Sequence, residues 1–249
     1  VNWLTKFSIN PCCGKWIRAG GMRCAGNKTI TWLTAGLASG LLFMGALRFS
    51  AATPTVLTPL AGYATPGYIA VTVLFAILFT NAGLPHNRFG FGSRLNLRHV
   101  LLALAAIAAL RLINFGLSPW LEQLLGGGRD LERFAGVEGS ISALALLLVT
   151  NWTFAAFGEE FAYRILLMRA IAYVLGDTRV ALICAVIFQA VIFGLVHAYQ
   201  GSTGIVGSAI SGLVLGAVTI AARWSIWPAA LAHGGNNTFG IVALYLGAE

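Results

Sequence analysis

The chain has 249 residues, of which 58% are hydrophobic and 10% charged, and its mean hydropathy is +0.81. Soluble domains carry roughly 25% charged residues, so this composition excludes an ordinary soluble protein and indicates a polytopic membrane protein. The short alternating segments of a transmembrane β-barrel are also absent from the sequence. At about 20 residues per helical span, we predict an all-α integral membrane bundle of about eight transmembrane helices, in a single domain over residues 29–249.

The net charge of +8 is unevenly spread, because ten Lys and Arg residues but no acidic residue precede Glu122. Residues 1–28 hold five of these ten basic residues. Binding to nucleic acid is one interpretation, but the basic residues are sparse and no nucleic-acid fold is visible. We favour a basic cytoplasmic N-terminal segment that obeys the positive-inside rule and touches anionic lipid. No compact apolar stretch of a cleavable signal occurs in it.

The apolar runs and the turn signals between them predict the helices in chain order. The Gly126-Gly127-Gly128 stretch and the mixed charges after it predict a flexible extramembrane loop over 118–140. Many glycines over 201–217 predict a close approach between helices. Whether the short run 161–176 spans the membrane stays open, because it carries two arginines. The predicted helices are 30–49, 66–84, 97–117, 141–157, 161–176, 180–198, 204–222 and 226–246.

Two adjacent glutamates and an arginine interrupt the apolar sequence near its middle. A charged residue at the centre of a span costs about 2.5–3.5 kcal/mol, so such a cluster indicates a functional site. Glu160 and Arg164 have the i, i+4 spacing of a favourable helical ion pair. Glu159 points about 100° away, without an intrahelical partner, and an unpaired carboxylate in a low-dielectric site suits a general base. An ion-pair cluster at a helix end is the structural alternative.

Three further polar residues lie in apolar runs downstream. His197 ends the run 180–198, and His233 and Asn237 lie four residues apart on one face of the last predicted span. Gly234 and Gly235 are expected to open room beside His233 for a substrate or water. Each histidine alone is typical of helix packing or of a hydrogen bond between helices. Together with Glu159, however, the three residues form a set that suits hydrolysis.

Hydrolysis of a peptide bond needs a base for water and donors for the oxyanion. Glu159 with His197 can activate the water, and His233 with Asn237 can stabilise the oxyanion. A proton pathway would use glutamate and histidine equally well, but it has less need for the asparagine.

Other intramembrane protease mechanisms fit the sequence less well. No HExxH motif is present. Both aspartates, Asp130 and Asp177, fall in predicted loops, which excludes a membrane-buried aspartyl dyad. A serine mechanism with Ser211 and His233 is conceivable, but the sequence around Ser211 lacks GxSG.

The three motifs occur in the order EExxxR, FxxxH and HxxxN within residues 141–246. This order resembles the CPBP (Abi) family, which includes the type II CAAX prenyl endopeptidases and prokaryotic relatives with bacteriocin-processing and self-immunity roles. The resemblance implies an integral membrane endopeptidase with its site inside the bilayer, opening toward the cytosol. It implies that the glutamate of the first motif and the histidine of the second activate water, and that the third motif stabilises the oxyanion. The predicted catalytic residues are Glu159, Glu160, His197, His233 and Asn237, with Arg164 and Phe193 as motif support.

The same resemblance sets the expected cofactor, partners and location. We favour a glutamate-type mechanism with no cofactor, although two histidines and a glutamate could hold zinc. The expected substrate is a membrane-embedded or lipidated protein or peptide, with a CAAX-type sequence as one option, met in the bilayer of a prokaryotic inner or plasma membrane. A non-catalytic membrane scaffold or bacteriocin-immunity protein, and a proton-coupled transporter, stay as alternatives.

Overall fold

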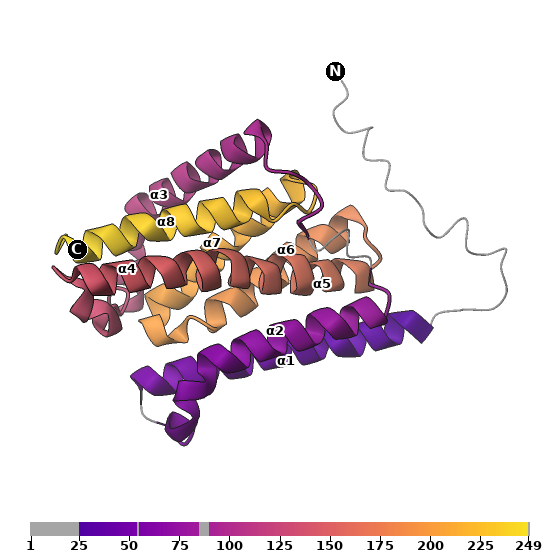
Figure 1. The fold of residues 1–249 in the computed structure, drawn as a ribbon, viewed down its shortest axis with the longest axis horizontal. Helices are drawn as coiled ribbons and strands as arrows, with labels where there is room; N and C mark the ends of the chain where they lie inside the picture. The colour runs from indigo at the N-terminus through magenta and orange to yellow at the C-terminus, as the bar shows by residue number, and fades with distance from the viewer. Residues whose placement is uncertain (1–24, 54, 85–89, 249) are drawn as a thin grey trace.

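The computed structural model describes residues 25–53, 55–84 and 90–248, so most of the expected N-terminal segment 1–28 lies outside the described residues. Within these ranges the regular elements are helices, which confirms the predicted all-α polytopic bundle (Figure 1). The α-helices are α1 Ala25–Ala52, α2 Ala64–Asn81, α3 Leu97–Leu125, α4 Ile141–Thr150, α5 Arg169–Val174, α6 Arg179–Leu195, α7 Gly201–Ala221 and α8 Trp227–Tyr245.

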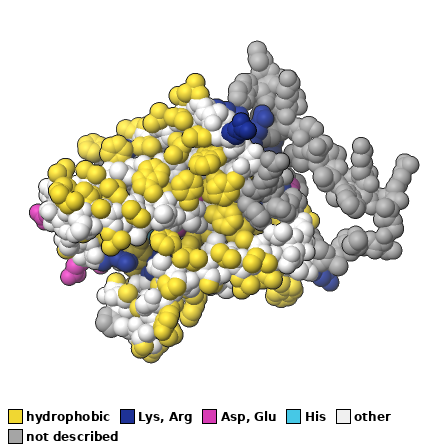
Figure 2. Space-filling model, viewed as in Figure 1, with side chains coloured by type: hydrophobic (Ala, Val, Ile, Leu, Met, Phe, Trp, Pro, Cys, Tyr) yellow, Lys and Arg dark blue, Asp and Glu magenta, His cyan; other side chains and the backbone are white. Residues whose placement is uncertain are grey.

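The outer surface of the bundle has the character expected of a protein embedded in lipid. Among the described residues, five helical stretches are long and apolar enough to cross a membrane, and α6 is a shorter apolar helix. Large hydrophobic side chains point outward, among them Trp32, Phe115 and Ile141, which are 76%, 88% and 72% exposed. Figure 2 shows hydrophobic side chains over most of one face, with charged side chains toward its two ends. The chain is an integral membrane protein.

Several helices begin where a polar side chain caps the first turn. Asn96, Ser140 and Thr178 accept hydrogen bonds from backbone N–H groups three residues further on, at the starts of α3, α4 and α6. Each cap satisfies a donor that has no partner within its helix. These caps fix where the helices enter the bundle, and they agree with the predicted starts at 97, 141 and 180 to within a residue.

The two helices predicted over 141–157 and 161–176 are a single one. Helical structure continues through 141–174, and its middle, Asn151–Glu159 and Phe161–Met168, is wound as π-helix. The predicted break near Gly158 is therefore wrong, because the backbone absorbs the polar residues by changing its hydrogen-bond pattern instead of stopping. π-Helical turns are uncommon and are frequent at functional sites. This helix carries Glu159, Glu160 and Arg164 near its midpoint.

Close packing of small residues holds α6 against α7, as predicted. A Cβ added at Gly212 would lie 2.9 Å from the Cα of Ala190, and one at Gly194 would lie 2.6 Å from the carbonyl oxygen of Ile205. Only glycine allows the two backbones to approach so closely. Helices α1 and α2 form a hairpin along one side of the bundle (Figure 1). The largest cluster of buried apolar side chains joins this hairpin to the helix over 141–174.

The connection expected over 118–140 is shorter and more ordered than predicted. Helix α3 continues to Leu125, and a short 3-10 helix covers Glu132–Val137. The hydroxyl of Thr203 donates to the carbonyl of Gly127 at 2.6 Å, and the N–H of Asp130 donates to the carbonyl of Gln200 at 3.0 Å. These bonds fasten the loop to the start of α7.

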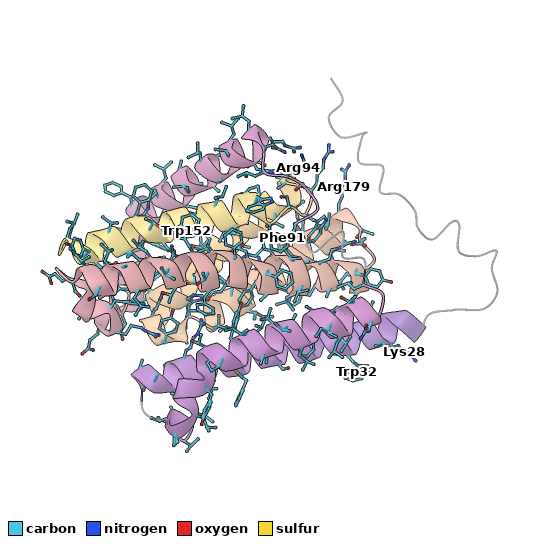
Figure 3. All side chains as sticks on the ribbon, in the orientation of Figure 1. Lys28, Trp32, Phe91, Arg94, Trp152 and Arg179 are labelled. Carbon is cyan, nitrogen blue, oxygen red and sulfur yellow. The ribbon has the colours of Figure 1, made fainter. Side chains whose placement is uncertain are left out.

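Three basic residues mark one end of the bundle, and the loop after α3 lies at the other. Lys28, Arg94 and Arg179 lie toward one end (Figure 3). The loop 126–131 joins the opposite end of the bundle, where α3 ends and α4 begins (Figure 1).

Candidate active site

Glu159 lies inside the bundle with a cation from a distant helix. Only 6% of the residue is exposed, and its Oε1 lies 3.2 Å from Nη1 of Arg48 on α1. The Arg48 guanidinium also stacks over the ring of Tyr68, 5.4 Å from its centroid, and the Tyr68 hydroxyl donates to the carbonyl of Gly158. Glu159 has no partner on its own helix, as predicted. The prediction that its carboxylate is unpaired is wrong. The hairpin of α1 and α2 supplies a counterion that helical periodicity does not reveal.

Glu160 joins Arg164 to the third motif. Its Oε2 lies 3.2 Å from Nε of Arg164, the predicted i, i+4 ion pair, and both residues are fully buried. Its Oε1 accepts a hydrogen bond of 2.7 Å from Nδ1 of His233. The bond fixes the orientation of the imidazole and leaves its Nε2 available for other contacts. Glu160 therefore positions His233.

His197 lies just after α6 and is held by the last turn of that helix and by an aromatic ring. Its Nδ1 donates to the carbonyl oxygen of Phe193 at 2.6 Å, one turn earlier, which leaves Nε2 free to accept a proton. The Phe193 ring lies 4.6 Å from the His197 ring and 5.9 Å from the His233 ring, centroid to centroid. The guanidinium of Arg164 stacks over the same ring at 4.3 Å. Phe193 thus packs between all three motifs.

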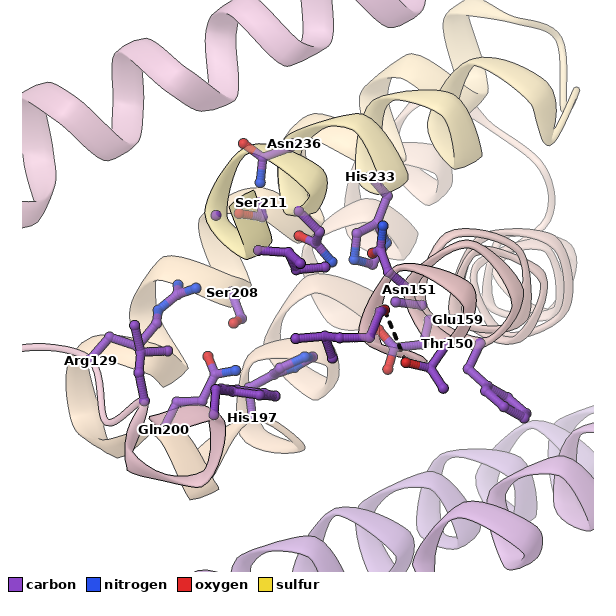
Figure 4. Close-up of a pocket in the computed structure, with 18 of the residues that line it drawn as sticks. Arg129, Thr150, Asn151, Glu159, His197, Gln200, Ser208, Ser211, His233 and Asn236 are labelled. Carbon is purple, nitrogen blue, oxygen red and sulfur yellow. Dashed lines mark hydrogen bonds between the residues drawn. The ribbon is translucent and has the colours of Figure 1, made fainter. Parts of the chain in front are cut away.

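One cavity of about 530 Å³ collects the predicted residues. Glu159, Phe193, His197, His233 and Asn237 all line it, although they come from three separate helical segments. Figure 4 shows the side chains of Glu159, His197 and His233 around a common space. Glu160 and Arg164 lie behind this wall. All seven residues singled out from the sequence therefore belong to one connected site.

Two asparagines that the sequence analysis did not single out also line this cavity. Asn151 donates from Nδ2 to the carbonyl of Gly234, while its buried Oδ1 has no hydrogen-bond partner. Asn236, next to Asn237, also has a buried Oδ1 without a partner. Asn151 falls in an apolar run, and an amide there is the signal that could have identified it.

The glycines beside His233 serve packing and do not open room for substrate. A Cβ added at Gly234 would lie 2.6 Å from the ring of Trp152, and one at Gly235 would lie 2.8 Å from Ile107. The prediction that they admit substrate or water is therefore wrong. They allow α8 to pack tightly against the helix over 141–174 and against α3, which holds His233 in place.

Four arginines on the cavity wall were not identified from the sequence. Two of them, Arg48 and Arg111, fall inside predicted apolar spans, and a cation at that depth is the signal that could have identified them. The other two lie in or near the loop after α3, which resembled an ordinary solvated connection. The four residues are Arg48, Arg111, Arg129 and Arg133.

The side chains at the site do not form a recognisable metal centre. Within residues 25–53, 55–84 and 90–248, no three His, Cys, Asp or Glu side chains are grouped so that they could hold a metal ion. The carboxylate of Glu159 is engaged by Arg48, and Nδ1 of each site histidine is engaged by protein oxygen. With Nδ1 engaged, each histidine could meet a metal ion only through its Nε2.

Comparison with known proteins agrees with the motifs. Residues 141–239 match the family model described as type II CAAX prenyl endopeptidase Rce1-like. No curated protein and no solved structure matches the chain. The matched region contains all three motifs and the helices that carry them, from α4 into α8. The match over residues 141–239 supports the family of type II CAAX prenyl endopeptidases that the motifs predict, and with it an intramembrane endopeptidase of that general kind.

Proposed function

We propose that this endopeptidase hydrolyses a peptide bond of a membrane-associated, lipidated peptide by a glutamate-type mechanism without a metal ion. The observation that carries the proposal is the shared cavity, in which a glutamate paired with Arg48 and two oriented imidazoles surround one space. A membrane-embedded protein segment is the related substrate, because the cavity lies among helices that cross the bilayer.

Glu159 and His197 are suited to activate the attacking water. Arg48 stabilises the carboxylate form of Glu159, which can accept a hydrogen bond from water. His197 donates through Nδ1 to Phe193, so its Nε2 lone pair faces other partners and can take up a proton. A base of this kind contributes typically about 10²–10⁴-fold to the rate.

His233 and Asn237 are suited to stabilise the oxyanion that forms on the carbonyl oxygen. The carboxylate of Glu160 accepts from Nδ1–H of His233, so a ring proton on Nε2 is the one that would donate to the oxyanion. Asn237 lines the same cavity one helical turn further on and offers amide N–H donors. Arg164 holds Glu160 from the side away from His233. Removing one such donor typically costs about 10²–10³-fold in kcat.

The test is cleavage of a fluorescent S-prenylated peptide by the purified protein in liposomes, followed by mass spectrometry. We expect Glu159→Gln and His197→Ala each to lower kcat at least about 100-fold, with unchanged thermal stability and helix content. We expect the wild type to keep its rate in EDTA. Phe115→Leu, on the exposed surface of α3, is the control for a substitution away from the cavity.

Three outcomes would contradict the proposal. Undiminished cleavage by Glu159→Gln would exclude the glutamate mechanism. Loss of activity in EDTA with recovery on adding Zn²⁺ would establish a metalloenzyme. Proton-driven solute uptake by the same liposomes, with no cleavage of any peptide, would point to the transporter alternative.

A further inference from the structure

One part of the active-site cavity carries positive charge that the proposed chemistry does not use. Arg111, Arg129 and Arg133 come from α3, from the loop after it and from the following 3-10 helix. Among residues 25–53, 55–84 and 90–248, none of the three makes an ion pair with a carboxylate. All three lie outside the region matched by the family model.

Arg111 is the most telling of the three because of its depth. It stands at the middle of α3, a span of 29 residues, where a charged side chain costs about 2.5–3.5 kcal/mol. Its guanidinium lies 6.0 Å from the ring centroid of Phe239 on α8, and it lines the cavity. A cation at mid-membrane that faces a cavity without an acidic partner is expected to meet an anion there.

Arg129 is held in place beside the same space. The hydrogen bonds from Thr203 to Gly127 and from Asp130 to Gln200 fasten its loop on both sides. The Arg129 guanidinium lies against the backbone of Gly207, where a Cβ would approach its Nη2 to 2.6 Å.

Arg133 and a serine complete the wall. The Arg133 guanidinium stacks on the ring of Tyr199 at 4.7 Å, which fixes its plane. Ser208 is only 5% exposed, and its hydroxyl has no hydrogen-bond partner among the described residues. Figure 4 shows Ser208 between Arg129 and the space bounded by His233 and Glu159. The wall thus offers several N–H donors and one O–H donor.

We propose that Arg111, Arg129 and Arg133, with Ser208, form a receptor for a carboxylate of the peptide substrate. Guanidinium groups match a carboxylate through paired hydrogen bonds. Arg129 and Arg133 are exposed, and Arg111 is half-buried, so Arg111 gains most from binding a carboxylate. The receptor shares one cavity with the hydrolytic residues, so a peptide whose carboxylate is bound there has its preceding bonds beside Glu159 and His197. The carboxylate is either the free C-terminus of the peptide or an acidic side chain.

This inference rests on the proposed function, and its test separates the two. The Glu159→Gln variant is placed in nanodiscs of phosphatidylcholine, and the binding of fluorescent S-prenylated Cys-Val-Ile-Ala peptides is measured. One peptide has a free C-terminal carboxylate, the second is its C-terminal amide, and the third is an amide with aspartate in place of the alanine. We expect the free acid to bind at least about tenfold more tightly than the plain amide.

Substitutions then assign the effect to the arginines. Arg129→Gln and Arg111→Gln should each reduce the preference for the free acid to less than about threefold, and Arg129→Lys should retain part of it. Arg94→Gln, at the opposite end of the bundle, should leave it unchanged. Tight binding of the aspartate peptide would identify a side-chain carboxylate as the ligand.

Equal binding of the free acid and both amides would overturn the proposal, and so would a preference that the arginine variants keep. If phosphatidylglycerol binds at the arginines while the peptides bind equally, the cluster serves lipid headgroups and the proposal is wrong. Cleavage of none of these peptides by the wild type, with the carboxylate preference intact, would contradict the proposed hydrolysis but not the receptor.

Discussion

Arg48 gives Glu159 the counterion that its own helix does not provide. Replacing Arg48 with glutamine leaves a buried carboxylate without its ion pair, and breaking such a pair typically costs about 3–5 kcal/mol. We expect kcat of Arg48→Gln to fall at least about tenfold with KM within about twofold, and we expect Arg48→Lys to recover part of the loss. Steady-state cleavage kinetics in liposomes measure both. An unchanged kcat would show that Glu159 does not depend on this cation.

Phe193 contacts both imidazoles and the guanidinium of Arg164. Replacing it with leucine keeps most of the volume and should cost less than about 1.5 kcal/mol of stability. The substitution removes the aromatic ring against which the imidazoles of His197 and His233 pack, so we expect kcat to fall several-fold. The matched control is Phe115→Leu, at a position 88% exposed. Equal kinetics for the two variants would mean that Phe193 is only a packing residue.

The site pairs that were predictable from sequence are local, because each joins residues four apart on a helix or at its end. Glu160 with Arg164 and Phe193 with His197 are each four residues apart, so helical geometry alone brings them together. The pair of Arg48 and Glu159 joins two distant helices, and periodicity carries no information about such contacts. The partnership of Glu160 with His233 was missed for the same reason.

At the scale of elements, the packing of α6 against α7 determines where Phe193 and His197 lie. A Cβ at Gly212 would meet the Cα of Ala190 at 2.9 Å and the Phe193 ring at 3.5 Å. We expect Gly212→Ala to destabilise the protein by about 1–3 kcal/mol and to lower activity. Gly116→Ala, on α3 with no atom within 4 Å of the added Cβ, should be neutral or slightly stabilising. Thermal unfolding in detergent compares the two, and similar melting temperatures would contradict this packing argument.

Helix starts were predicted well and helix ends less well. The starts of α3, α4 and α6 follow polar caps that are visible in the sequence. The glycine and the charges near Gly158 resembled a break, because the π-helical winding of 151–168 leaves no simple signature in sequence. The sequence predicted a flexible loop after α3. Its order comes from hydrogen bonds to Gln200 and Thr203, which are distant in the sequence and leave no local pattern.

At the scale of the whole molecule, the bundle separates Lys28 from the loop 126–131 (Figures 1 and 3). We therefore expect cysteines introduced at Lys28 and at Gly128 to react with an impermeant maleimide from opposite sides of sealed vesicles. The native cysteines are first replaced by serine. The positive-inside rule predicts that Lys28 faces the cytoplasm, and a cytoplasmic opening of the site stays a prediction. Labelling of both positions from one side would contradict this arrangement of the helices.

The ion pair between α1 and the long central helix has a consequence for any shortened form of the protein. A chain beginning at Ile141 would retain every motif and the entire region matched by the family model. It would nevertheless leave the carboxylate of Glu159 without its native counterion. In such a fragment, Glu159 would have to be protonated or pair with another cation. The three motifs alone therefore do not make a functional active site.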